Sequence, residues 1–291
     1  MKSFSKRTKE MLAKLEPGEL CCCEAEMMGI LMFAGKFKGA EVRVTLDCYE
    51  SILRFAQLLE ICLGAKIEIE KLKSSFFCTL QDKRVLQKIV EYELSSQSLD
   101  ERLTSKECCC AAFLRGAFLG GGTVTDPKKT YNMEFVVYSN KIHDEFKLIL
   151  QKMNLGFRSI KKGNGYVLYT KNSEIICDAL AYMGAFSAQM EMLNVKIERE
   201  VRSEITRASN GETANMDKVI EASSRHISAI EKIREVSGLE SLPDELRELA
   251  ILRMEFKDLS LDQLGKKLNP PLSKSGVNHR LKKLLEIAKK L

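Results

Sequence analysis

Three consecutive cysteines occur twice in this chain, at 21–23 and at 108–110. Thiolates bind soft metal ions and form disulfides, so the triplets raise both kinds of chemistry. Successive helical residues point about 100° apart, so a triplet cannot chelate one ion without a partner segment. We interpret these cysteines mainly as small buried hydrophobes, and a metal or disulfide across the two triplets stays open.

Other reactive residue types are sparse or badly spaced. His143, His226 and His279 do not lie near another histidine or a cysteine at ligand spacing, which disfavours a zinc enzyme. The glycines at 120–122 lack the Lys-Ser/Thr of a phosphate-binding loop. No serine or cysteine lies in a motif for an activated nucleophile. The sequence therefore predicts no catalytic residue, no metal site, no cofactor and no small-molecule substrate.

Positive charge gathers at the C-terminal end. The chain has 291 residues and a net charge of +6, whereas the segment from Leu264 onward has eight Lys or Arg against one acid, a net of +7. The rest of the chain is therefore close to neutral, at −1. A basic block confined to one end predicts a polyanion partner there. The alternative is a solvated basic helix face.

The first two thirds of the chain contain a duplication. A shift of 87 residues superimposes the triplets and aligns Ala25 with Ala112, Gly29 with Gly116, and Gly35 with Gly122. The first copy continues with a strand at 41–46, a helix ending at Gly64, strands at 66–72 and 75–80, and a helix at 82–94. The second continues with a strand at 131–138, a helix ending at Gly156, strands at 157–162 and 165–170, and a helix at 173–183. Each half is predicted to be α-β-β-α-β-β-α with an antiparallel sheet.

The helix that leads each half contains an unusual number of glycines. Each glycine costs about 1 kcal/mol in a helix interior. This cost is tolerable where small residues let two helices approach closely. The sequence therefore predicts that the two leading helices pack side by side on a pseudo-two-fold axis. The glycines concerned are Gly29, Gly35, Gly116, Gly120, Gly121 and Gly122.

The glycine-rich segments MMGILMFAG (27–35) and LRGAFLGGG (114–122) resemble the two LAGLIDADG motifs of homing endonucleases. In those enzymes an acid before the last glycine of each motif holds the divalent metal that cuts DNA. Those positions are Ala34 and Gly121 here, and neither residue can bind Mg²⁺, which needs oxygen ligands. Asp126, beside Pro127, is interpreted as a turn residue. The resemblance therefore implies the fold without the nuclease.

A longer resemblance covers nearly the whole chain. Three blocks, FLRGAFLGGGTVTDPKKTYNMEF, NGETANMDKVIEAS (210–223) and LNPPLSKSGVNHRL (268–281), occur in the order found in the WhiA family of bacterial regulators. The resemblance implies DNA binding through a degenerate LAGLIDADG domain and a C-terminal helix-turn-helix. It also implies a role in transcription, cell division, chromosome segregation and, where the organism sporulates, sporulation.

The last fifty residues indicate a helix-turn-helix by themselves. Helices are predicted at 242–255 and 259–268, the second capped by Ser260 and ended by the NPP sequence. A third helix begins at Ser273 or Ser275. Its apolar stripe is Val277, Leu281, Leu284 (or Leu285) and Ala288. The alternative is a small three-helix bundle for protein contacts.

The N-terminal part of the third helix is expected to enter the major groove. The residues expected at base edges are Ser273, Lys274, Ser275, Asn278 and His279. Those expected at phosphates are Arg280, Lys282 and Lys283. Further possible backbone contacts are Lys266, Lys267, Arg199, Arg202 and Arg207. For the last three, a solvated, ion-paired face is the favoured interpretation.

These patterns divide the chain into five segments. They are an N-terminal segment (1–19), the first half (20–100), the second half (101–190), a helical linker (191–215) with a helix break at Asn210-Gly211, and a C-terminal helical domain (216–291). The helix-turn-helix occupies about 258–291. The fold class is α+β, with an all-α domain at the end.

The expected function is sequence-specific binding of double-stranded DNA by a transcriptional regulator that is not an enzyme. Other transcription or division proteins are possible partners, and the N-terminal domain could contact either DNA or a protein. No apolar stretch is long enough for a membrane span and no signal peptide is evident, so a cytoplasmic, nucleoid-associated location is expected. The alternatives are a metal-dependent DNA endonuclease, or a thiol- or metal-responsive regulator that uses the cysteine triplets.

Overall fold

The computed structural model describes residues 2–38, 40–94 and 103–291. The chain divides into two compact units, with the boundary between Arg199 and Glu200. The segment boundary drawn at 100/101 lies outside the described residues. Those at 190/191 and 215/216 both fall within one helix, α8 (Phe186–Val236). In the described ranges, no helix is long and apolar enough to cross a membrane.

The first half of the N-terminal unit follows a short helix, α1 (Phe4–Leu12), which is capped by Ser3. Its elements are α2 (Leu20–Ala34), β1 (Gly35–Lys38), β2 (Glu41–Leu46), α3 (Tyr49–Leu63), β3 (Glu70–Leu72), β4 (Ser75–Leu80) and α4 (Lys83–Leu94). β2 alternates between buried and more exposed residues, as the pattern EVRVTL predicts. Gly64 ends α3 in the left-handed conformation, with φ of 65°.

The second half repeats the same order. Its elements are α5 (Glu107–Gly121), β5 (Gly122–Val124), β6 (Met133–Val137), α6 (Asn140–Lys152), β7 (Arg158–Lys162), β8 (Gly165–Thr170) and α7 (Ser173–Met183). Each half contains a four-stranded antiparallel sheet, ordered β1-β2-β4-β3 in the first and β5-β6-β8-β7 in the second. The predicted duplicated α-β-β-α-β-β-α fold is confirmed.

One predicted helix end is wrong. The helix that was expected to run to Gly156 ends at Lys152, and Asn154 takes the left-handed conformation with φ of 56°. Asparagine tolerates this conformation because its short polar side chain can hydrogen-bond locally. A glycine is therefore not required there, and Gly156 lies in the connection between α6 and β7.

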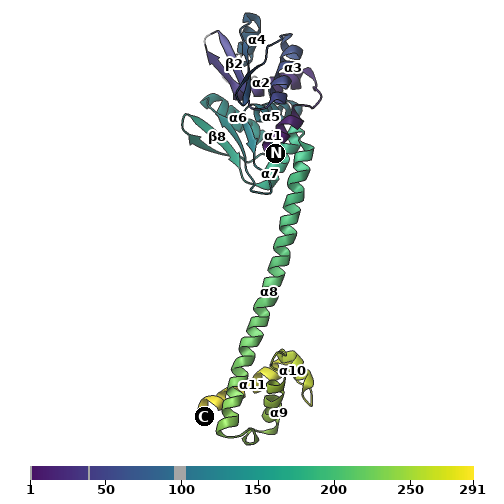
Figure 1. Ribbon diagram of the computed structural model, residues 1–291, viewed down its shortest axis with the longest axis vertical. Helices are drawn as coiled ribbons and strands as arrows, with labels where there is room; N and C mark the ends of the chain where they lie inside the picture. Colours follow the sequence, from purple (N-terminus) through teal and green to yellow (C-terminus); the bar gives the residue numbers. More distant parts are fainter. Residues whose placement is uncertain (1, 39, 95–102) are drawn as a thin grey trace. The chain divides into compact units, whose positions relative to one another are not determined.

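α2 and α5 pack against each other at the junction of the two halves (Figure 1). A Cβ added at Gly29 would lie 2.5 Å from the carbonyl oxygen of Phe113, and one at Gly116 would collide with the carbonyl oxygen of Glu26. A Cβ at Gly120 would lie 3.0 Å from the carbonyl oxygen of Ile30. These glycines let the two backbones touch, so the predicted helix pairing is confirmed.

The glycines at the helix ends act differently from those at the helix contact. A Cβ at Gly35 would collide with the carbonyl oxygen of Leu31, in the last turn of the same helix. A Cβ at Gly122 would likewise collide with the ring and the Cα of Phe118, in the last turn of α5. These two glycines thus allow each helix to turn directly into a strand, and they do not mediate the pairing as predicted.

The C-terminal unit is all helical. After the end of α8 come a short 3₁₀ helix (Leu239–Ser241), α9 (Asp244–Glu255), α10 (Leu261–Lys267) and α11 (Lys274–Lys290). Their apolar side chains form a core separate from that of the first unit. The predicted break at Asn210-Gly211 is wrong, because α8 continues through it. One interior glycine costs only about 1 kcal/mol, which helical neighbours on both sides can offset.

Candidate nucleic-acid interface

α10 and the turn after it are fixed by local contacts. The Ser260 hydroxyl accepts a hydrogen bond from the backbone N–H of Gln263, and the Gln263 side chain accepts one from the backbone N–H of Ser260, at 2.9 Å. At the other end, the N–H of Leu272 donates to the carbonyl of Gly265 at 2.9 Å. A Cβ at Gly265 would collide with the Leu272 carbonyl oxygen. The turn therefore requires a glycine at this position of α10.

α11 is capped by Ser273, not by Ser275, and its first helical residue is Lys274. The Ser273 hydroxyl accepts a hydrogen bond from the backbone N–H of Gly276 at 3.3 Å. Its predicted role at a base edge competes with this capping role. The buried stripe of α11 contains Leu284 and not Leu285, and its members are Val277, Leu281, Leu284 and Ala288.

Six of the predicted DNA-contacting residues form one exposed face of α11. They are Lys274, Ser275, Asn278, His279, Lys282 and Lys283. They recur every four residues, so they lie along one side of the helix, away from the buried stripe. Three lysines, one amide, one hydroxyl and one imidazole can together contact phosphates and base edges.

Three other predicted contact residues already have partners within the unit. The Arg280 guanidinium lies 2.9 Å from a carboxylate oxygen of Glu245 and its side chain is 18% exposed, so it joins α11 to α9. Lys266 pairs with Asp262 at 2.7 Å. The Lys267 ammonium lies 4.1 Å from the ring centre of Phe256. These contacts favour Lys282 and Lys283 over Arg280 as phosphate ligands.

The arginines of α8 differ from one another. Arg199 donates a hydrogen bond to the carbonyl of Lys128 at 2.8 Å and stacks over the Tyr131 ring, so it has a structural role in the first unit. Arg207 donates to the carbonyl of Ser203 in its own helix. Arg202 is exposed. A DNA contact by these residues stays a prediction.

α9 contributes a buried arginine to the helix-turn-helix that was not predicted from the sequence. Arg253 is 1% exposed and donates a hydrogen bond to the carbonyl of Leu259 at 2.8 Å, in the segment that leads into α10. Its neighbour Met254 is only half-buried, so the arginine and not the methionine lies on the buried face of α9. Helical spacing from Leu249 to Arg253 could have revealed it, because residues four apart share a face.

The two degenerate motif positions are the last residues of their helices. Ala34 ends α2 and Gly121 ends α5. A Cβ at Gly121 would lie 3.0 Å from the carbonyl oxygen of Val136 and 3.1 Å from the ring of Phe33. Phe33 in turn packs edge-on against Phe146, with ring centres 4.9 Å apart. Close contacts with Val136 and Phe33 thus leave little room for an acidic side chain at this half-buried position.

Comparison with known proteins places this arrangement in a family. The family model for the WhiA LAGLIDADG-like domain matches residues 110–202, and that for the WhiA C-terminal HTH domain matches residues 205–288. The chain is 33% identical to the probable cell division protein WhiA of Alkaliphilus metalliredigens, with 98% of this chain and 97% of the relative aligned. It is 35% identical to that of Ruminiclostridium cellulolyticum, with 99% and 98% aligned.

The chain belongs to the WhiA family. The crystal structure of full-length WhiA from Thermotoga maritima superimposes with a TM-score of 0.64 at 27% identity, covering 100% of this chain and 99% of that one. A structure of an N-terminal WhiA LAGLIDADG domain matches 64% of this chain and 92% of its own, with a TM-score of 0.51 and 21% identity. The predicted fold class and family are therefore confirmed.

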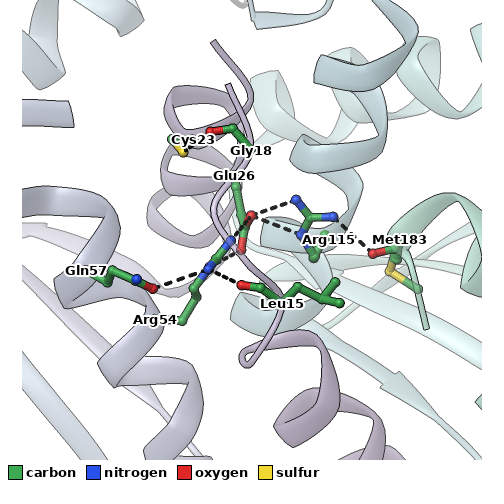
Figure 2. A network of polar contacts seen from close by, with 8 residues as sticks. All are labelled: Leu15, Gly18, Cys23, Glu26, Arg54, Gln57, Arg115 and Met183. Carbon is green, nitrogen blue, oxygen red and sulfur yellow. Dashed lines mark hydrogen bonds and ion pairs between the residues drawn. The ribbon is translucent and has the colours of Figure 1, made fainter. Parts of the chain in front are cut away.

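In this member of the WhiA family, a buried ion network joins the paired helices to their surroundings. Figure 2 shows Glu26 of α2 between Arg54 of α3 and Arg115 of α5. Its carboxylate oxygens lie 2.8 Å from the Arg54 Nε and 2.8 Å from an Arg115 terminal nitrogen. Arg54 also donates to the carbonyl of Leu15, and Arg115 to that of Met183. All three charges are used in intramolecular contacts, so we assign them to the scaffold.

Proposed function

We propose that this protein is a sequence-specific, double-stranded-DNA-binding regulator that acts through the exposed face of α11. The single observation that carries the proposal is the face formed by Lys274, Ser275, Asn278, His279, Lys282 and Lys283 on the second helix of a helix-turn-helix. Lysines there suit phosphates, and Asn278 suits an adenine edge.

The proposed role in the cell is inferred from the names of the relatives. They are named probable cell division proteins, and membership of the family supports a role in transcription, cell division and chromosome segregation. A nucleoid-associated, cytoplasmic location and contacts with other transcription or division proteins belong to the same proposal.

The proposal includes the absence of LAGLIDADG-type nuclease activity. No Asp or Glu occurs in 27–35 or 114–122, and hydrolysis by two metal ions needs several carboxylates. Core packing at Gly121 further disfavours an acid there. Supercoiled plasmid incubated with Mg²⁺ or Mn²⁺ should stay intact, and nicking that tracks with the purified protein would contradict this part.

The DNA face is tested by paired charge removals on α11. Replacing Lys282 and Lys283 with alanine should weaken binding to a duplex, because each loses a phosphate contact. The slope of log affinity against log salt should fall by about 1 for each contact removed. Gel shifts over a range of salt concentrations measure both quantities.

The matched control replaces Lys289 and Lys290 with alanine, which removes the same charge from the same helix. These lysines lie in the last turn of α11, away from the end expected in the groove. Their loss should weaken binding much less. Equal weakening by the two double variants would show that general charge, and not this face, carries the affinity.

A further inference from the structure

The two cysteine triplets meet at the start of the paired helices. α2 begins at Leu20 and α5 at Glu107, so each triplet lies in the first turn of its helix. The 87-residue shift that relates the halves makes Cys21 equivalent to Cys108, and Cys22 to Cys109. The parallel pairing of the helices supplies the partner segment that a single triplet lacks.

Four of the six thiols form one cluster. The Sγ atoms of Cys21, Cys22 and Cys109 all lie within 4.8 Å of one another. The Sγ of Cys108 lies 4.0 Å from that of Cys109 and so extends this group to a fourth thiol. Cys22 and Cys109 are buried, Cys21 is half-buried and Cys108 is exposed. The cluster therefore has a protected interior and one open side.

The third cysteine of each triplet points elsewhere. The Cys23 thiol lies 3.4 Å from the carbonyl oxygen of Gly18, and the Cys110 thiol lies 3.3 Å from that of Thr104. Both donate to backbone oxygens outside the cluster. The first two members of each triplet are thus the available ligands, and they form two pairs related by the pseudo-two-fold axis.

We propose that Cys21, Cys22, Cys108 and Cys109 bind one Zn²⁺ ion that links the two halves at their pseudo-two-fold axis. Structural zinc takes four ligands in a tetrahedron, and Zn–S bonds of about 2.3 Å put neighbouring sulfurs about 3.8 Å apart. Three of the sulfurs lie within 4.8 Å of one another and the fourth lies 4.0 Å from that of Cys109, which is close to this spacing. A two-fold axis through a tetrahedral ion relates its ligands in two pairs, as the duplication does here.

The surroundings suit the charge of such a site. Binding breaks four S–H bonds, forms four Zn–S bonds and releases four protons to solvent, which leaves a net charge of −2. The N-terminal ends of α2 and α5, each equivalent to roughly +0.5 charge, face this charge. Lys106, the residue before α5, adds a cation close to Cys108, and this cation offsets the acid Glu107 in the first turn of the helix.

Other occupants fit this cluster less well. An iron–sulfur cluster needs its ligand thiolates spread around several metal atoms, whereas three of these sulfurs lie within 4.8 Å of one another. Two cross-half disulfides would use the same four residues, but the family's helix-turn-helix suggests a protein of the reducing cell interior, where thiols stay free.

The test compares the full-length chain with two double variants, all purified under reducing conditions with a chelating step. Metal analysis should find about one zinc per wild-type chain and little zinc in Cys21→Ser/Cys108→Ser, which removes the two less buried ligands. Cys23→Ser/Cys110→Ser is the matched control and should keep its zinc, because serine can donate to the same carbonyls. Zinc removal should lower the melting temperature of the wild type but not of Cys21→Ser/Cys108→Ser.

A second measurement does not depend on the folding of any variant. Titration of the stripped wild-type chain with Co²⁺ should produce the visible absorption bands of tetrahedral, thiolate-bound cobalt, and Zn²⁺ should abolish them. Absence of these bands, stoichiometric iron or copper instead of zinc, or disulfides among the four residues in the reduced preparation would each overturn the proposal.

Discussion

At the scale of single residues, the buried charges affect the stability of the fold more than the exposed charges do. Glu26, Arg54 and Arg253 are each at most 2% exposed, and a charge in such a place requires partners. None of them stands in a recognisable motif. Glu26 and Arg54 pair across helices far apart in the chain, so the sequence could not predict their burial. The helical spacing from Leu249 does indicate a buried face at Arg253, and spacing alone predicted the exposed residues of α11.

Neutralising the carboxylate of the buried network should destabilise the N-terminal unit. Glu26→Gln leaves Arg54 and Arg115 without their anion, and loss of one partner of a buried ion pair costs about 3–5 kcal/mol. We expect a loss of about this size in the free energy of unfolding, measured by urea denaturation. Glu60→Gln is the control, because Glu60 pairs with Lys66 at the surface and should cost under about 0.5 kcal/mol. Similar losses in both variants would contradict the assigned role of Glu26.

His226 should make the C-terminal unit sensitive to mild acid. Burial, followed by the charges of Arg253 and Arg225, lowers the pKa of His226 to about 4. The histidine pKa in the unfolded chain is about 6.5. Below pH 6.5, His226 is therefore protonated in the unfolded chain but stays neutral in the folded chain until the pH approaches 4. Stability is retained above pH 6.5 and lost as the pH falls toward 4, by about 2 kcal/mol at pH 5.

The measurement compares wild-type and His226→Leu chains by urea denaturation at pH 7 and pH 5. Carboxylates titrate alike in both chains, so the difference between the two pH responses isolates His226. The wild type should lose about 2 kcal/mol more than the variant over this interval. Parallel responses would mean that His226 is protonated in the folded protein at pH 5.

At the scale of elements, caps and apolar spacing predicted the boundaries that depend on local sequence. They failed where contacts with other parts of the fold determine the structure. The β2 and α7 boundaries, the Ser260 cap and the apolar stripe of α11 follow from spacing and capping chemistry. The predicted break at Gly211 failed, because nothing lies within 4 Å of a Cβ there and the helix simply continues. A glycine in sequence does not reveal whether it is needed for a close contact or merely tolerated.

Two glycines of the C-terminal unit test this distinction directly. Gly265→Ala should cost about 2–3 kcal/mol, because its Cβ collides with the Leu272 carbonyl oxygen and the turn before α11 must open. Gly211→Ala should instead stabilise the same unit by about 0.5–1 kcal/mol, the difference in helix propensity. Urea denaturation measures both, and gel shifts should show weaker DNA binding only for Gly265→Ala. Equal effects of the two substitutions would contradict the assigned contact.

At the scale of the whole molecule, the duplication and the basic C-terminal segment predict from the sequence that the chain has two different parts. The N-terminal unit has its own core, which contains residues from both halves, and the C-terminal unit has another. Convergence of the thiols at the pseudo-two-fold axis could not be predicted, because it depends on the register in which α2 and α5 pair. Separate cores imply that the two units can be tested separately.

A chain ending at Ser241 should lose DNA binding while its N-terminal unit stays folded. This truncation removes α9, α10 and α11 and leaves the N-terminal core, which lies between Phe4 and Met192, intact. Gel shifts should show no complex at protein concentrations where the full chain binds, and circular dichroism should show cooperative melting of the N-terminal unit. Undiminished binding by the truncated chain would contradict this prediction and would indicate that the DNA site lies in the N-terminal sheets. A truncated chain that is folded but does not bind would support DNA recognition through the C-terminal helices. The duplicated domain would then be a unit that keeps the LAGLIDADG-like fold without the metal-binding acids.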